Sequence, residues 1–327
     1  MITEYRIAET GGVVRGPADL SRFDSSIIWL DACEPDDGEL QQLSDAMGFE
    51  VPNRHDMTEI ELSNRLYHED DSHIMIANLL PRSETEVLPP RPVAFILKQN
   101  LLLTIRFCNF FSFDRETTSV PRNRHIHTPM TIFTELLDEA VSDRADNLEF
   151  SMRHMETLTS KLFHTAITGK RNTEPENPEL EEALLLIGAM GERVSNIRES
   201  IASLQRVLNY AQTYVPDEWL GDRKAIMRSM RSDLMALSDE AGFFMNKLSF
   251  NLDATLGMIN IEETKIIRVL SIVTLVLSPP VLIAGIYGMN FRVMPELDWG
   301  YGYLYSLLLM GATALAPILY LKRKKWF

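Results

Sequence analysis

Short apolar runs separated by polar and acidic stretches occupy the first part of the chain. The segment at 36–48 has helical spacing, whereas four other runs have the length and composition of β-strands. Only Gln99-Asn100 separates the last two runs, which predicts a hairpin. We therefore expect an α/β domain over residues 1–128. The strand-like runs are 26–31, 73–80, 92–98 and 101–107.

Helical spacing of the apolar residues begins at Thr128. Thr128-Pro129 and Asn177-Pro178 both have the form of an N-cap followed by proline at the first helical position. Because Pro216 follows the second helical pattern, we expect two long helices over residues 129–215. A third helix is predicted to begin near Trp219.

The third helix carries an apolar stripe whose steps of three and four are typical of a coiled-coil seam. No glycine or proline interrupts it between Gly257 and the uncharged segment that follows, so the stalk helix at 216–268 is expected to continue to about residue 287. A continuous helix is able to transmit an event along its length, although a passive tether would show the same pattern. The stripe consists of Met230, Leu234, Leu237, Ala241, Phe244, Leu248, Leu252, Thr255 and Ile259.

Two segments near the C-terminus, residues 269–289 and 299–321, contain no charged residue. Each is long enough to cross the hydrocarbon core of a bilayer, which takes about 20 helical residues. Buried core helices are the alternative, but these usually keep some charge or are shorter. We therefore expect two transmembrane helices joined by an outer loop at 290–298.

The charges around these segments predict their orientation. Four consecutive cations open the tail at 322–327, whereas the loop carries only Arg292 against Glu296 and Asp298. By the positive-inside rule, both termini and the soluble domain lie in the cytoplasm, as in a multi-pass protein of the inner (plasma) membrane. The N-terminus is charged early and lacks the apolar stretch of a signal peptide.

Composition excludes several classes of function. The formal net charge of −14 argues against a nucleic-acid partner. Cys33 and Cys108 form no CxxC pair, so we expect no zinc-thiolate site. The two spans lack Asp, Glu, His and Cys, which leaves no proton relay, and no GxxxxGK[ST] phosphate loop occurs, so a transported solute would have to move down its own gradient. We expect neither enzyme activity nor an organic cofactor.

Hydroxyl-bearing and small residues follow one face of the first span. Two interpretations are open: a close-packed helix interface, or the lining of a water-filled path. Pro279-Pro280 removes two backbone donors, so the carbonyls of Leu275 and Val276 lose their helical partners. The proline pair could simply kink the helix, or the freed carbonyls could face a conduit. The face consists of Thr264, Ser271, Thr274, Ser278, Gly285 and Gly288.

The first span ends in the stretch YGMNF at 287–291, which is followed by MPEL at 294–297. This end closely resembles the GMN signature of the CorA family of magnesium and divalent-cation transporters, and the segments at 34–39 and 259–269 are also similar to that family. The resemblance implies an α+β membrane protein that assembles as a homopentameric channel. Two long antiparallel helices would follow the α/β domain, and the stalk helix would lead into a pore-lining first span.

The resemblance assigns ion selectivity at the pore mouth to Gly288, Met289 and Asn290. Because Mg²⁺ gives up its water reluctantly, a ring of Asn290 amides that hydrogen-bonds the hydrated ion would select it. Asn290 has the alternative of being a left-handed or C-capping residue, and the two roles are compatible. An outer acidic ring of Glu296 and Asp298 would raise the local cation concentration.

The resemblance also implies a pore lining. Position 278 is often a bulky apolar gate in the family and is serine here, so Leu270 and Ile267 become the gate candidates. Ser271 and Thr274 join the lining from the polar face. The family's pore positions, counted back from the motif, fall on Val281, Ser278, Leu270, Ile267 and Thr264.

The resemblance also implies that acidic groups between protomers sense cations on the cytoplasmic side. Each candidate has the alternative of being a solvated surface charge, and His125-Ile126-His127 is only a weak metal motif. The candidates are Asp36, Asp37, Glu69, Asp70, Asp71, Asp233 and Asp239.

These features together predict a gated passive influx channel for Mg²⁺, with Co²⁺ or Ni²⁺ as further substrates, closed by cytoplasmic divalent cation. Its partners would be copies of itself, membrane lipid and divalent metal ions. A Zn²⁺ transporter of the ZntB type is the alternative within the family, although the MPEL sequence favours magnesium. A tail-anchored coiled-coil sensor that conducts nothing is the alternative from another class.

Overall fold

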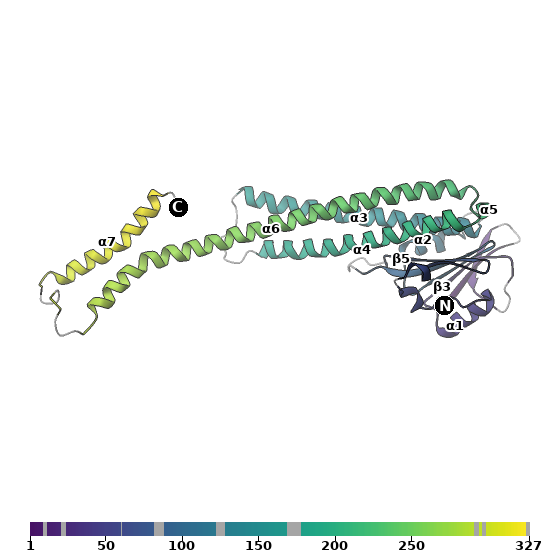
Figure 1. Cartoon of the computed structure of the whole chain (residues 1–327), viewed down its shortest axis with the longest axis horizontal. Coiled ribbons are helices and arrows are strands. Elements are labelled where there is room, and N and C mark those ends of the chain that lie inside the picture. The colour runs from purple at the N-terminus through teal and green to yellow at the C-terminus, as the bar shows by residue number, and fades with distance from the viewer. Residues whose placement is uncertain are drawn as a thin grey trace. The chain divides into compact units, whose positions relative to one another are not determined.

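The structure is a computed structural model of the chain (Figure 1). It describes residues 1–8, 12–20, 24–59, 61–81, 88–121, 128–168, 178–290, 294–295 and 299–324. The chain divides into two compact units. The first comprises Met1–Arg171 with Glu181–Leu252, and the second comprises Asn172–Leu180 with Asp253–Phe327.

A seven-stranded sheet forms the centre of the first unit, in the order β2-β1-β3-β7-β6-β5-β4. The pair β3–β7 is parallel and the other pairs are antiparallel. The predicted strand runs correspond to β3, β5, β6 and β7, and β6 and β7 form the predicted hairpin. The strands are β1 (Ile2–Ile7), β2 (Val13–Pro17), β3 (Ile27–Cys33), β4 (Leu66–Glu69), β5 (Ser72–Leu79), β6 (Arg91–Lys98) and β7 (Leu101–Arg106).

One face of this sheet is covered by helix α1 (Asp37–Met47), as Figure 1 shows. The Asp36 side chain accepts a hydrogen bond from the Glu39 N–H, and the Glu39 side chain accepts one from the Asp36 N–H, which closes a capping box. The helix ends at Gly48, whose φ of 83° suits a residue without a Cβ. Leu40, Leu43 and Met47 pack into the core on this side of the sheet. Short 3₁₀ turns follow at Asp56–Thr58 and Leu62–Asn64.

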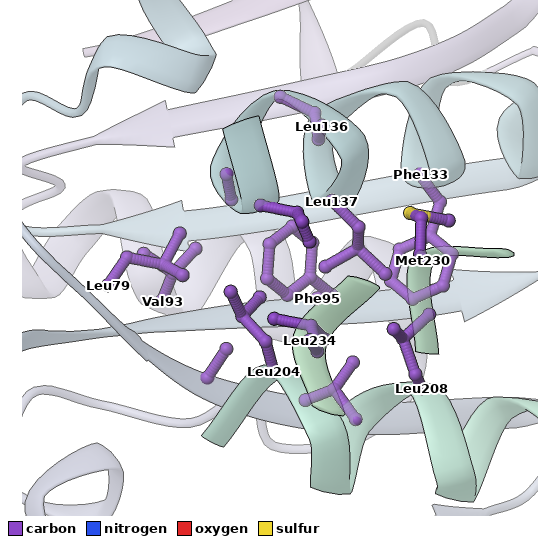
Figure 2. Close-up of a cluster of buried hydrophobic side chains, with 14 of the residues drawn as sticks. Leu79, Val93, Phe95, Phe133, Leu136, Leu137, Leu204, Leu208, Met230 and Leu234 are labelled. Carbon is purple, nitrogen blue, oxygen red and sulfur yellow. The ribbon is translucent and has the colours of Figure 1, made fainter. Parts of the chain in front are cut away.

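Helices pack against the opposite face. They are α2 (Phe111–Ser119), α3 (Pro129–Thr168), α4 (Pro178–Tyr214) and the first part of α6 (Arg223–Tyr287). The Thr128 hydroxyl accepts from the Thr131 N–H at 3.1 Å, so Thr128 is the predicted N-cap of α3. Figure 2 shows Phe95 of β6, Leu137 of α3, Leu204 of α4 and Leu234 of α6 in one buried cluster.

The connection between α4 and α6 differs from the prediction of a helix starting near Trp219. Trp219 lies in a separate single turn, α5 (Asp217–Leu220), and α6 begins only at Arg223. Gly221 separates the two with a φ of 45°, a conformation that breaks a helix and favours glycine. From Arg223, α6 is continuous over 65 residues and includes Pro279 and Pro280.

The apolar stripe of α6 is buried over its first part, where Met230, Leu234, Ala241, Phe244 and Leu248 lie in the core. The predicted seam is wrong at Leu252, which is 38% exposed. Asn251 and Thr255 are the buried residues of this turn. At Asn251 and Thr255, the buried side of α6 thus changes from apolar to polar, and the apolar core between α6 and the other helices ends.

The second unit contains the rest of α6 and helix α7 (Gly302–Arg323). Both helices are long and apolar enough to cross a membrane. Their most apolar stretches are 0% and 11% buried within the chain, which distinguishes them from the core helices of a soluble protein. The structure ends α6 at Tyr287 and begins α7 at Gly302, so both helical segments differ from the predicted spans by two or three residues at an end.

Candidate ion pathway

The predicted polar face lies along the distal part of α6. Thr264, Ser271 and Thr274 each donate their hydroxyl to the carbonyl four residues earlier, at 2.7, 2.7 and 2.9 Å. Their hydroxyl hydrogens are therefore used within the helix, while the oxygen lone pairs stay available as acceptors. Uncharged oxygen acceptors can hydrogen-bond the water molecules around a cation, whereas an anion would need hydrogen-bond donors.

A shallow groove of about 510 Å³ follows this face. It brings together Ser271, Thr274 and Ser278 with the gate candidate Leu270. Leu275 and Pro279 complete its lining, and the proline is the reason why the Leu275 carbonyl has no amide donor four residues on. The kink residues and the predicted lining thus share one surface.

The apolar members of the predicted lining find no cover within their own chain. Ile267, Leu270 and Val281 are 63%, 65% and 68% exposed. Large exposed apolar side chains in a row indicate contact with lipid or with another protein surface. The single chain therefore leaves the candidate pathway open on one side.

The GMN tripeptide begins where α6 ends. The Gly288 N–H donates to the Ala284 carbonyl at 2.9 Å and the Met289 N–H to the Ile286 carbonyl at 3.2 Å. A Cβ on Gly288 would lie 3.1 Å from the Ala284 oxygen, so a larger residue would push against the backbone. Asn290 is exposed and has no positive φ, so the left-handed alternative for this residue is wrong.

Several predicted residues of the outer loop lie outside the described part of the chain. These are Glu296 and Asp298 of the outer acidic ring, together with Arg292. The His125-Ile126-His127 stretch lies outside it as well.

The predicted metal-sensing carboxylates lie on separate elements of the single chain, and their prediction concerns sites between protomers. Asp36 caps α1, and Asp37 lies in its first turn. Among the described residues, no group of three or more His, Cys, Asp or Glu side chains is arranged to hold a metal ion. Glu69, Asp70 and Asp71 lie at the β4–β5 turn, whereas Asp233 and Asp239 lie on α6.

A buried carboxyl that the sequence did not reveal lies between α2 and α3. Glu116 is 5% exposed, and its carboxylate accepts from the Ser119 hydroxyl at 3.0 Å. Burial raises its pKa to about 7, and the charges of Glu135 and Glu139 act in the same direction. Glu135 in turn lies 3.9 Å from Arg223, the first residue of α6. The surface-like sequence around Glu116 gave no signal, because its burial depends on how the two helices pack.

Comparison with known proteins decides the family. The model of the CorA-like Mg²⁺ transporter proteins matches residues 24–323. The chain belongs to the CorA family. It is therefore a membrane transporter rather than an enzyme, and the expected fold class of a soluble α/β domain, a long helix and two C-terminal transmembrane helices is confirmed.

Individual relatives agree with this assignment. The magnesium transport protein CorA of Escherichia coli (strain K12) is 28% identical over 307 residues, which cover 91% of this chain and 92% of that protein. The complete CorA magnesium transporter of Methanocaldococcus jannaschii matches with a TM-score of 0.72 and 20% identity, over 100% of this chain and 99% of its own. The ZntB cytoplasmic domain of Vibrio parahaemolyticus matches with a TM-score of 0.58 and 10% identity, over 79% of this chain and 97% of its own. The two structural likenesses concern the fold alone.

Proposed function

We propose that this CorA protein is a gated, passive influx channel for Mg²⁺. The observation that carries the proposal is the face of α6 that presents hydroxyl oxygens without a charged group and leads to Gly288, Met289 and Asn290. A hydrated divalent ion needs acceptors that hold its water without binding the metal so tightly that it cannot leave. At about 100 mV the membrane potential supplies about 4.6 kcal/mol for inward movement of a divalent ion, so no other energy source is needed.

A homopentamer would complete the pathway. Each chain leaves Ile267, Leu270 and Val281 uncovered, and five copies around an axis would close these faces upon one another. In this arrangement Thr264, Ser271, Thr274 and Ser278 line the pore between the apolar rings. The second span would form the outer ring towards lipid.

The proposed topology places both termini in the cytoplasm of the inner membrane. Lys322 and Arg323 lie in the last turn of α7 and Lys324 follows it, so the cations end the helix on the side that the positive-inside rule assigns to the cytoplasm. The α/β domain at 1–128, the helices at 129–215 and the stalk at 216–268 would lie on the same side. The spans at 269–289 and 299–321 would then place the loop at 290–298 outside.

Ion uptake tests the proposal directly. The purified protein in liposomes that contain a Mg²⁺-sensitive dye should take up Mg²⁺ when an inside-negative potential is applied, and Asn290→Ala should abolish the uptake. Asn209→Ala, an exposed amide on α4, is the matched control and should leave it unchanged. Absence of uptake in correctly assembled wild-type pentamers would contradict the channel and favour a non-conducting sensor.

The same assay separates the ions. Uptake of Zn²⁺ without Mg²⁺ would favour a transporter of the ZntB type, whereas Co²⁺ or Ni²⁺ uptake alongside Mg²⁺ agrees with our proposal. If cytoplasmic Mg²⁺ closes the channel through the acidic groups of the soluble domain, removing it should loosen that domain. Limited proteolysis that is identical in chelator and in Mg²⁺ would contradict this regulation.

A further inference from the structure

The β4–β5 hairpin carries a pair of histidines far from the GMN tripeptide in the sequence. His68 and His73 are direct partners in the antiparallel register of these strands. Residues directly opposite each other on neighbouring strands point to the same face of the sheet. Accordingly, the two imidazole rings lie 4.7 Å apart between centroids, with 59° between their planes.

His73 is buried with an unused ring nitrogen. His73 is only 4% exposed, and its Nδ1 has no hydrogen-bond partner among the described residues. Tyr210 of α4 and Trp219 of α5 present their rings edge-on at 6.0 and 5.7 Å from the His73 ring. Buried polar atoms in folded proteins nearly always have a partner, so this nitrogen calls for a ligand.

The surroundings of His73 favour the neutral form of its ring, which is the form that binds metals. Burial lowers the pKa of His73, and the neighbouring His68 lowers it further. A neutral imidazole has a free lone pair, whereas imidazolium does not coordinate. His68 is exposed, so an ion from solvent would reach the pair through this residue.

We propose that His68 and His73 form a two-imidazole site for a divalent transition-metal ion such as Ni²⁺ or Zn²⁺. Water would fill the remaining coordination positions, because no third His, Cys, Asp or Glu joins the pair among the described residues. Imidazole nitrogen suits Zn²⁺, Ni²⁺ and Cu²⁺, whereas Mg²⁺ prefers oxygen ligands. The site therefore distinguishes transition metals from the ion of the proposed channel.

Its place in the fold makes binding observable. His73 contacts the ring of Trp219, and Trp219 lies in α5, the single turn between α4 and α6. Paramagnetic Ni²⁺ at the site should quench the fluorescence of this tryptophan, whereas diamagnetic Zn²⁺ should not quench it in the same way. Trp219→Phe should remove most of the Ni²⁺-dependent signal without removing the bound ion.

Equilibrium dialysis of the full-length protein against Ni²⁺, with saturating Mg²⁺ present to fill the oxygen sites, tests the proposal. We expect the wild type to bind one more Ni²⁺ per chain than the His68→Gln, His73→Gln double variant does. Each single variant should weaken binding by about tenfold or more, which is the cost seen even for groups that only orient metal ligands. His154→Gln, an exposed histidine on α3, is the control and should bind as the wild type does.

Two outcomes would overturn the site. The first is equal Ni²⁺ binding by the wild type and the double variant, and the second is complete displacement of Ni²⁺ by Mg²⁺. His68→Gln changes an exposed residue, so the test holds even if the buried His73→Gln variant fails to fold. Ni²⁺ binding that survives Asn290→Ala separates this site from the proposed channel.

Discussion

The two parts of α6 place the same kinds of residues in opposite environments. In the first part, Leu234 is completely buried, together with Met230, in the core that Figure 2 shows, and Phe244 is buried as well. In the distal part, Leu270 and Leu282 are 65% and 66% exposed. Both parts have apolar residues at helical spacing, and one uninterrupted helix contains both.

The difference lies in where each part finds its partners. The first part packs against α3, α4 and the sheet, so a single chain satisfies it. The distal part has no such cover, and its apolar residues need lipid or other copies of the chain. The candidate pathway belongs to this distal part. Its function would thus depend on an assembly that one chain cannot provide.

Leucine truncation should separate the two parts most strongly. Leu234→Ala removes a fully buried side chain and should lower the free energy of unfolding of the soluble unit by about 3 kcal/mol, within the usual range for buried leucine. Leu282→Ala, the matched change in the distal part, should alter that value by less than about 0.5 kcal/mol. Urea unfolding followed by circular dichroism measures both, and equal losses would contradict the comparison.

Local signals in the sequence predicted much of the fold. Thr128-Pro129 begins α3 as expected, because capping depends only on neighbouring residues. The strands β1, β2 and β4 were not predicted, since they are short and carry charged residues such as Glu4 and Arg6. The break at Gly221 was missed for a related reason, because a glycine in a helical pattern does not by itself indicate a positive φ.

The pathway and the buried polar groups differ in how far the sequence revealed them. Helical periodicity alone predicted the polar face of α6, and the GMN tripeptide predicted where this face ends. The His68 and His73 pair depends on the register of two strands, and the burial of Glu116 depends on the packing of α2 on α3. Periodicity contains neither kind of information.

A change at the proposed gate should act on uptake and not on folding. Leu270→Ser replaces an apolar ring by a hydrated one, and we expect Mg²⁺ uptake at high internal Mg²⁺ to rise about tenfold, equivalent to about 1.4 kcal/mol of barrier. Val269→Ser, one residue away on another face of the helix and 62% exposed, is the control and should leave uptake unchanged. A rise in both variants would indicate general loosening of the helix instead of a gate.

The smallest expected effect concerns pH. Burial raises the pKa of Glu116 above its ordinary value of 4.5 to about 7, so the folded protein holds this proton more tightly than the unfolded chain does. The stability from this group is present below about pH 4.5 and is lost as the pH rises through about 7. Between about pH 6 and about pH 7, the wild type should therefore lose about 1 kcal/mol more unfolding free energy than Glu116→Gln. Glu149→Gln, an exposed carboxyl on α3, is the control and should behave as the wild type.

The pH experiment also sharpens the comparison of the two parts of α6. Glu135, which contributes to the raised pKa of Glu116, is paired with Arg223 at the start of the packed part. The distal part from Val269 to Ile286 contains no titratable side chain. Mg²⁺ uptake should therefore have the same pH dependence in Glu116→Gln as in the wild type, even though unfolding does not. If uptake changes together with unfolding, protonation near the start of α6 is coupled to its distal part, and the two parts do not act independently.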